Sequence, residues 1–167
     1  HSIAELKLAK YFQPMSKATF TRRMNKLKAD PLYDPEMDRY TNEYAEYVKT
    51  RAAAYCMAPS VMLERRVDFS RFVPHGFGTS DCIIAIGKNL EVIDFKYGKG
   101  VKVSADENPQ MMLYALGALD LISILMPIET VRMAIVQPRI DNISEYLVDA
   151  EVLTAWGKSC LLYTSDA

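Results

Sequence analysis

The spacing of apolar residues divides the chain into a helical first third and a more strand-rich remainder. Up to Met57, apolar residues recur every three or four positions, which is the period of amphipathic helices. Prolines and capping residues separate the segments of this region. The pattern predicts three helices, which cover residues 2–12, Ser16 to about Ala29, and Asp34-Pro35 to about Met57.

After Pro59 the apolar residues alternate or form short runs, as in strands. Three strands are predicted in succession, over residues 61–69, 77–86 and 90–97. The short turn Gly87-Lys88-Asn89 makes the last two a hairpin.

Beyond the hairpin, the dipeptide Asn108-Pro109 is typical of a helix start, and the apolar helix that follows is expected to end before Pro127. A fourth strand over residues 130–137 and a last helix over about 149–158 complete the chain. This order predicts an α/β fold. Its mixed central sheet contains a three-strand meander, a crossover helix and a fourth strand, and it is flanked by helices, with extra helices at the N-terminus.

Composition narrows the class of protein but not its activity. The 167 residues suit one domain, and a chain that is half hydrophobic and one quarter charged is expected to fold. The formal net charge of -1 means that any nucleic-acid surface must be a local patch. No apolar run approaches the roughly 20 residues of a membrane span, so we expect no membrane association.

The three cysteines are scattered and odd in number: Cys56, Cys82 and Cys160. Their spacing argues against a disulfide framework and against zinc or iron–sulfur sites, which need short paired spacings. A reducing, cytoplasmic setting is expected.

Both ends of the chain look cut. The first residues lie inside a helical pattern without an initiator Met, and the last eight, from Cys160 to Ala167, do not extend the preceding helix pattern. These eight resemble a peptide produced when a sequencing adaptor is translated by mistake; the alternative is an ordinary C-terminus. We therefore expect an N-terminally truncated domain over residues 1–158 and a tail over 159–167.

The most informative residues are Asp81, in Gly-Thr-Ser-Asp, and the triplet Asp94-Phe95-Lys96. Alternate residues of a strand face the same way, so Asp94 and Lys96 are expected to project from one face and Phe95 into the core. Pairing about the turn places Asp81 opposite about residue 95, within one position of register.

Two carboxylates and an ammonium group in one place require a reason, because carboxylates repel each other and resist burial. A bound Mg²⁺ or Mn²⁺ would provide one, since these cations prefer carboxylate oxygen. Such a metal can polarise a phosphodiester and activate water, while Lys96 orients the water or neutralises the phosphate. The alternative from spacing alone is a cluster of surface ion pairs.

Together with the later segment Gln110-Met111-Met112-Leu113-Tyr114, these motifs resemble the series of the PD-(D/E)XK nuclease superfamily. The similarity is to the branch of RecB-like and CRISPR-associated exonucleases, and within it to an uncharacterised phage-associated family. It spans residues 1–158. The resemblance implies a restriction-endonuclease-like core, Mg²⁺ or Mn²⁺ as cofactor, and DNA as substrate.

Carried over by position, the resemblance makes Asp81, Asp94 and Lys96 catalytic. It implies metal ligation by Asp81, Asp94, the backbone carbonyl of Phe95 and the side chain of His1. Glu5 shares the helix face of His1 and is a weaker candidate. The four cysteines that hold an iron–sulfur cluster in some relatives have no counterpart here, so no cluster is expected.

Further candidates are less specific. Gln110 and Tyr114 share a helix face, where they either contact nucleic acid and brace the site or serve ordinary packing. Lys99 and Lys102 follow the strand of Asp94 and are expected to contact phosphates. Glu64 either faces the metal region or pairs with a neighbouring arginine.

The resulting hypothesis is a Mg²⁺- or Mn²⁺-dependent deoxyribonuclease, an exonuclease serving phage or mobile-element recombination or replication, with proteins of those processes as partners. Two alternatives are a non-catalytic nucleic-acid-binding module and a structural domain that retains the nuclease fold.

Overall fold

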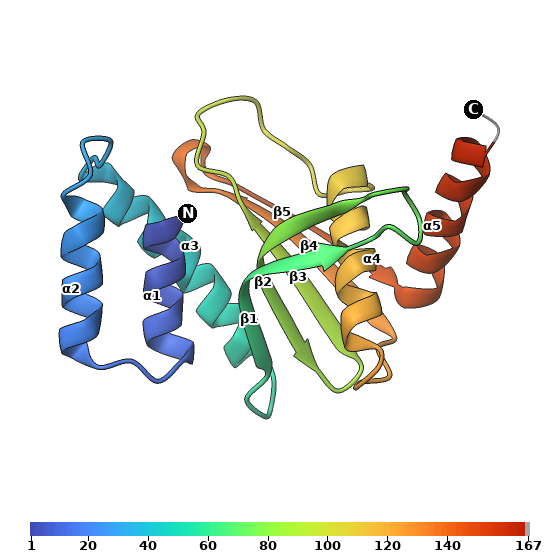
Figure 1. The fold of residues 1–167 in the computed structure, drawn as a ribbon, viewed down its shortest axis with the longest axis horizontal. Helices are drawn as coiled ribbons and strands as arrows, with labels where there is room; N and C mark the ends of the chain where they lie inside the picture. Colours follow the sequence, from blue (N-terminus) through green and yellow to red (C-terminus); the bar gives the residue numbers. More distant parts are fainter. Residues whose placement is uncertain (166–167) are drawn as a thin grey trace.

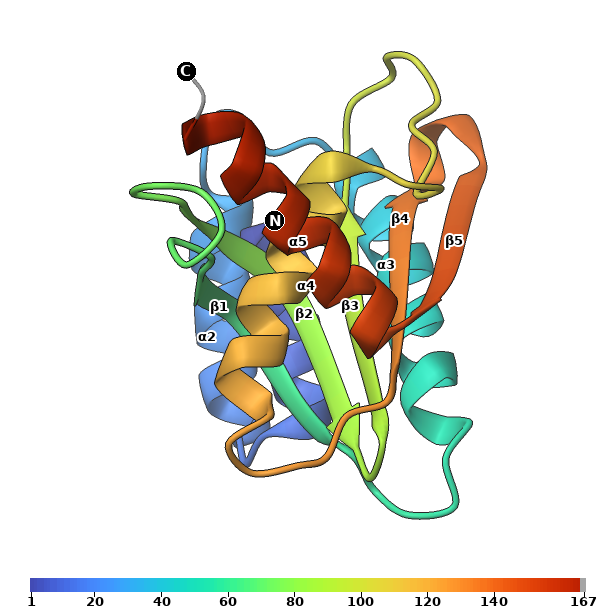
Figure 2. The same ribbon diagram turned by 90° about the vertical axis from the view of Figure 1, so that its right-hand side faces the viewer.

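A five-stranded sheet separates two groups of helices in the computed structural model, which describes residues 1–165 (Figures 1 and 2). On one side lie α1, α2 and α3, with α2 packed against the outer side of α1 (Figure 1). On the other side lie α4 and α5 (Figure 2). The helices span Ser2–Phe12 (α1), Lys17–Lys28 (α2), Glu36–Ala53 (α3), Pro109–Ile122 (α4) and Ala150–Ser165 (α5).

The strands lie in the sheet in the order in which they occur in the chain, β1-β2-β3-β4-β5, and only β3 and β4 are parallel. The α4 helix makes the crossover between these two, so the predicted meander, crossover helix and fourth strand are confirmed. The strands are Ser60–Asp68 (β1), Phe77–Ile86 (β2), Asn89–Phe95 (β3), Thr130–Gln137 (β4) and Asn142–Asp149 (β5).

Capping residues begin the helices where the sequence indicates. The side chains of Ser16 and Asn108 accept hydrogen bonds from main-chain N–H groups in the first turns of α2 and α4. At α3 the prediction was one residue early, because Pro35 is the N-cap residue and has no side-chain cap; Asp34 precedes it, and its Oδ1 accepts from the N–H of Glu36 at 2.9 Å. These caps satisfy donors that would otherwise be unpaired at the helix N-termini.

Some predicted boundaries were wrong. The last helix does not end near residue 158 but continues to Ser165, so most of the segment expected to fall outside it is helical. The third helix ends at Ala53 rather than near Met57, whereas α4 ends at Ile122, before Pro127 as predicted. The final two residues of the predicted tail, 166–167, lie outside the described residues.

The fifth strand was missed by the sequence analysis. It pairs antiparallel with β4 and forms one edge of the sheet, and its alternation of half-buried and exposed residues leaves few fully apolar positions. Its N-terminal half therefore lacks the apolar run that marked β4 as a buried strand.

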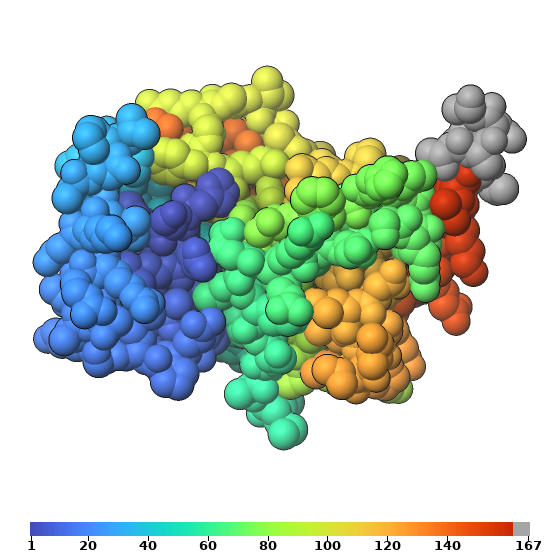
Figure 3. Space-filling model, in the orientation of Figure 1, coloured from blue at the N-terminus to red at the C-terminus, as the bar shows by residue number. Residues whose placement is uncertain are grey.

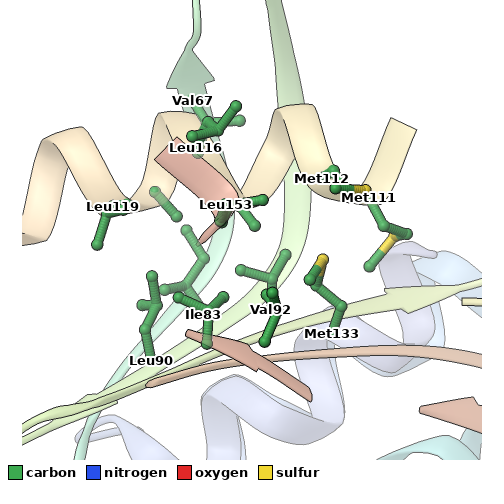
Figure 4. Close-up of a cluster of buried hydrophobic side chains, with 14 of the residues drawn as sticks. Val67, Ile83, Leu90, Val92, Met111, Met112, Leu116, Leu119, Met133 and Leu153 are labelled. Atoms are coloured by element: carbon green, nitrogen blue, oxygen red, sulfur yellow. The ribbon is translucent and has the colours of Figure 1, made fainter. Parts of the chain in front are cut away.

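Alternate residues of the central strands supply two separate cores. Ile83 and Val92 face α4 and α5, where they meet Leu116 and Leu153 (Figure 4). Their neighbours, including Ile93 and Phe95, face α1 and α3. Although α4 is strongly apolar, no helix within residues 1–165 combines the length and hydrophobicity that crossing a membrane requires. The sheet is thus buried on both faces along β3, and polar side chains gather where that strand ends.

Gly117 marks the closest approach of α4 to β1. A methyl group at this position would lie 2.9 Å from the Cβ of Val67 and 3.2 Å from main-chain atoms of Asp68. We expect Gly117→Ala to lower the free energy of unfolding by about 1–3 kcal/mol, because overpacking outweighs the helix-propensity gain of about 1 kcal/mol. Urea denaturation measures the change. The control is Gly100→Ala, where an added methyl meets no atom within 4 Å; equal midpoints for both variants would contradict the prediction.

Candidate functional site

The β2–β3 hairpin brings Asp81 beside Asp94. A two-residue turn, Gly87-Lys88, closes the hairpin, and the glycine has a φ of 58°. Cys82 pairs with Ile93, so continuing this register puts Asp81 opposite Asp94, one position from the predicted partner and within the stated uncertainty.

The main chain of Phe95 fixes the Asp81 carboxylate. The N–H of Phe95 donates to Oδ2 of Asp81 at 2.7 Å. The Phe95 ring points the other way, where it is buried and stacks on Tyr44 at a centroid distance of 4.6 Å. The predicted alternation along this strand is therefore confirmed, with Asp94 and Lys96 on one face and Phe95 in the core on the other.

Lys96 connects Asp94 to the α4 helix. Its Nζ lies 3.0 Å from Oδ2 of Asp94 and 3.5 Å from Oε1 of Gln110. The amide of Gln110 in turn lies 3.5 Å from the hydroxyl of Tyr114. The two helix residues thus share a face, as predicted, and that face meets the catalytic candidates.

Burial makes the charged form of Asp94 energetically unfavourable. The residue is 9% exposed, and its Oδ2 receives no hydrogen bond of acceptable geometry despite the nearby Lys96. Burial, followed by the negative charge of Asp81, raises the pKa of Asp94. A buried carboxylate oxygen without a full hydrogen-bond partner is the kind of atom that a cation would satisfy.

His1 reaches the same place from α1. Its Nε2 lies 2.7 Å from the carbonyl oxygen of Phe95 and 3.6 Å from Oδ2 of Asp81. Because a carbonyl only accepts, Nε2 must carry a proton in this arrangement. The Asp81 carboxylate, more than any other group, raises the pKa of His1 to about 9, against the opposing effect of partial burial.

Two further carboxylates line the small hollow around His1 and Asp81, namely Glu5 and Glu64. Glu64 lies within β1 between the pairs Leu63–Cys82 and Arg65–Ser80, a register that places it opposite Asp81, and its φ is 47°. Burial, then the charges of Asp81 and Glu5, raise the pKa of Glu64 to about 7. Of the two alternatives for Glu64, the structure gives proximity to Asp81, and within residues 1–165 no ion pair joins it to an arginine.

The carboxylate and carbonyl oxygens of the site are ligands that a small hard cation prefers. His1 faces the Phe95 carbonyl as a hydrogen-bond donor at 2.7 Å, so it would have to lose that proton before it could ligate a cation. No three His, Cys, Asp or Glu side chains of the described chain are grouped as a metal site, however. A cation here would depend on the carbonyl as a third ligand.

Lys99 and Lys102 are exposed on the loop between β3 and α4, which rises beyond the end of the sheet (Figure 1). They flank Val101, which is 86% exposed. Their exposure suits contact with an extended ligand.

Gln137 anchors that loop, a role that the sequence did not reveal. It is 2% exposed, accepts from the N–H of Val103 at 2.8 Å and donates to the carbonyl of Val101 at 3.2 Å. Asn142 donates to the same Gln137 oxygen at 2.7 Å. The only signal was a glutamine at the end of an apolar strand, since a buried amide must find partners.

The family model described as "Protein of unknown function (DUF2800)" matches residues 1–166. Among solved structures, the chain is similar to "Crystal structure of SSO0001", at 15% sequence identity and a TM-score of 0.38, covering 96% of this chain and 84% of that one. This TM-score is too low to indicate a shared fold or activity.

Because His1 is protonated at neutral pH, we predict that the affinity of the site for a metal depends on pH. If Nε2 ligates the metal, it must first lose a proton whose pKa is about 9. We therefore expect Mn²⁺ affinity, measured by calorimetry, to rise about tenfold per pH unit between about pH 7.5 and 8.5, where Glu64 is already ionised. His1→Ala should remove this slope and His75→Ala, which changes the other histidine, should keep it. A wild-type affinity that is independent of pH would exclude His1 as a ligand.

Proposed function

The chain belongs to the DUF2800 family, and we propose that it is a metal-dependent deoxyribonuclease of the PD-(D/E)XK type. The observation that carries the proposal is the convergence at the end of β3. Asp94 and Lys96 form an ion pair on one face, and Asp81 is held there by the main chain of Phe95. The motif series in the sequence gives independent support.

Different residues of the chain would each contribute to phosphodiester hydrolysis. A divalent cation held by Asp81, Asp94, the Phe95 carbonyl and His1 would supply Lewis-acid stabilisation of the charge that develops on phosphorus-bound oxygens. The ammonium of Lys96 has three donors. Its Nζ lies 3.0 Å from Asp94 and 3.5 Å from the Gln110 oxygen, where it would also donate to the attacking water or to a phosphate oxygen.

Water attack on phosphorus breaks the bond to the leaving oxygen, which takes up a proton. The positive charge of Lys96 would contribute to the rate because it lies where negative charge appears during the reaction. Lys96 is held from both sides, so its charge needs no rearrangement when substrate arrives. This arrangement favours hydrolysis over simple phosphate binding, for which an exposed lysine would suffice.

One observation favours a second candidate, a non-catalytic nucleic-acid-binding module with the same fold. Among the described residues, the acidic and histidine side chains are not grouped in threes as a metal site. A chain that had lost its metal would keep Lys96 and the exposed Lys99 and Lys102 for phosphate contacts. The two candidates differ in whether metal is needed.

We further propose that the protein is an exonuclease, that it acts in phage or mobile-element recombination or replication, and that it works in the cytoplasm. The cysteines are scattered and odd in number in the sequence, which favours a reducing compartment. The preference for DNA ends and the biological setting rest on the resemblance of the motifs alone.

The decisive test is cleavage of end-labelled linear DNA and of circular DNA in Mg²⁺, Mn²⁺ or EDTA. We expect metal-dependent loss of linear DNA, with Asp94→Asn and Lys96→Met each at least about a hundredfold slower. Matched controls are Asp149→Asn and Lys88→Met, which change exposed residues of the β5 strand and the hairpin turn. These controls should cut at the wild-type rate.

Thermal denaturation separates the two candidates if nothing is cut. A nuclease site must be stabilised by Mn²⁺, because a ligand that binds only the folded state raises its melting temperature. Wild-type protein that binds DNA equally in Mn²⁺ and EDTA, cuts none, and shows no Mn²⁺ shift would establish the binding module instead.

A further inference from the structure

A second hollow adjoins the candidate site on the α1 side of β3, which is the side opposite Asp94 and Lys96. Its volume is about 360 Å³, and it shares two residues with the site, His1 and Phe95. In the space-filling view, the start of α1 lies on the surface between the α2–α3 connection and the loop after β3 (Figure 3). A group bound in this hollow would therefore touch residues that also hold Asp81.

The lining of the hollow suits a flat aromatic group. Ile3, Leu27 and Met37 give it apolar surface, and Tyr33 and Tyr97 add aromatic rings. Asp30 and His1 are the charged side chains of its lining. A nucleobase has apolar faces and polar edges and matches such a site.

Hydrogen bonds between α1 and α3 brace one wall of the hollow. The Nζ of Lys7, on α1, donates to Oδ1 of Asp38 at 2.9 Å and to the hydroxyl of Thr41 at 2.7 Å, both on α3. Thr41 itself lines the hollow. A preformed site costs less ordering on binding than one that must assemble.

A cation stands beside the hollow without a full set of partners. The guanidinium of Arg139 lies 4.6 Å from the centre of the Tyr97 ring. Its Nε is buried and has no hydrogen-bond partner among the described residues. The positive charge of this guanidinium would attract the phosphate of a nucleotide whose base lies against Tyr97.

We propose that this hollow receives the base of a nucleotide next to the scissile phosphate, so that the substrate is an unpaired DNA strand or end. The proposal rests on the proposed nuclease function, which supplies the phosphate position beside Lys96. A base inside a duplex is stacked and paired and cannot enter a side hollow without leaving the helix. Single-stranded DNA presents its bases at no such cost.

The experiment uses the full chain in EDTA, so that binding is measured without cleavage. The probe is a short single-stranded oligonucleotide with 2-aminopurine placed in turn at each of the first few positions from either end. Stacking on an aromatic ring quenches this base, and we expect quenching at one position on binding the wild type. An abasic residue at that position should weaken binding about tenfold, a typical effect of one stacked base.

Variants of the protein test whether the quenching of 2-aminopurine arises in the hollow. Tyr97→Ala and Tyr33→Ala should each lose the quenching and weaken binding about tenfold. Tyr97→Phe should retain both, and Tyr11→Ala, which removes a tyrosine 59% exposed on α1, should match the wild type. Circular dichroism checks that each variant is folded, and the abasic arm tests the idea without any protein variant.

The outcomes separate this proposal from the nuclease. Quenching without cleavage in Mn²⁺ would overturn the nuclease but support the base site. Cleavage by a protein that quenches no probe position, and that binds abasic and intact strands equally, would overturn the base site and leave the nuclease standing. Equal cleavage of duplex and single-stranded ends would also argue against the proposed substrate class.

Discussion

Phe95 ties the candidate site to the core of the protein. Its ring is 2% exposed and stacks on Tyr44, so the strand cannot shift without disturbing the packing against α1 and α3. Its N–H holds Asp81, and its carbonyl accepts from His1. A single buried residue thereby positions two candidate ligands, while its neighbours in the strand present Asp94 and Lys96 on the opposite face. Such support from the core is what keeps a catalytic group within the narrow geometry that chemistry needs.

The same place concentrates unfavourable interactions. Asp94 and Glu64 have raised pKa values because they are partly or largely buried near the charge of Asp81. Glu64 also adopts a left-handed backbone conformation inside a strand. Proteins tolerate repulsion and strain of this kind chiefly at functional sites, where stability is exchanged for activity. A cation would relieve the repulsion, because it favours the charged form of every carboxylate around it.

The parts of this arrangement that depend on short-range rules could be predicted. The alternation of a strand and the shortness of one turn were enough to place Asp81 near Asp94, and Ser16 and Asn108 cap helices as their identities indicate. Contacts between distant segments could not be derived in that way. His1 meets Phe95 across 94 positions, and only the resemblance to a known motif series pointed to it. The edge strand β5 was missed because its exposed face dilutes the apolar pattern, and the partners of Gln137 come from two other segments.

The end of β3 also divides two chemical environments. On the α4 side, Lys96 and Asp94 present charge next to Gln110, and a phosphate would find hydrogen-bond donors there. On the α1 side, beyond the Phe95 main chain, the surface is apolar and aromatic. A nucleotide has the same division between a charged backbone and a flat base. Since the net charge of the chain is -1, long-range attraction would contribute little to binding a polyanion, and under the proposed function this local match would have to provide both affinity and orientation.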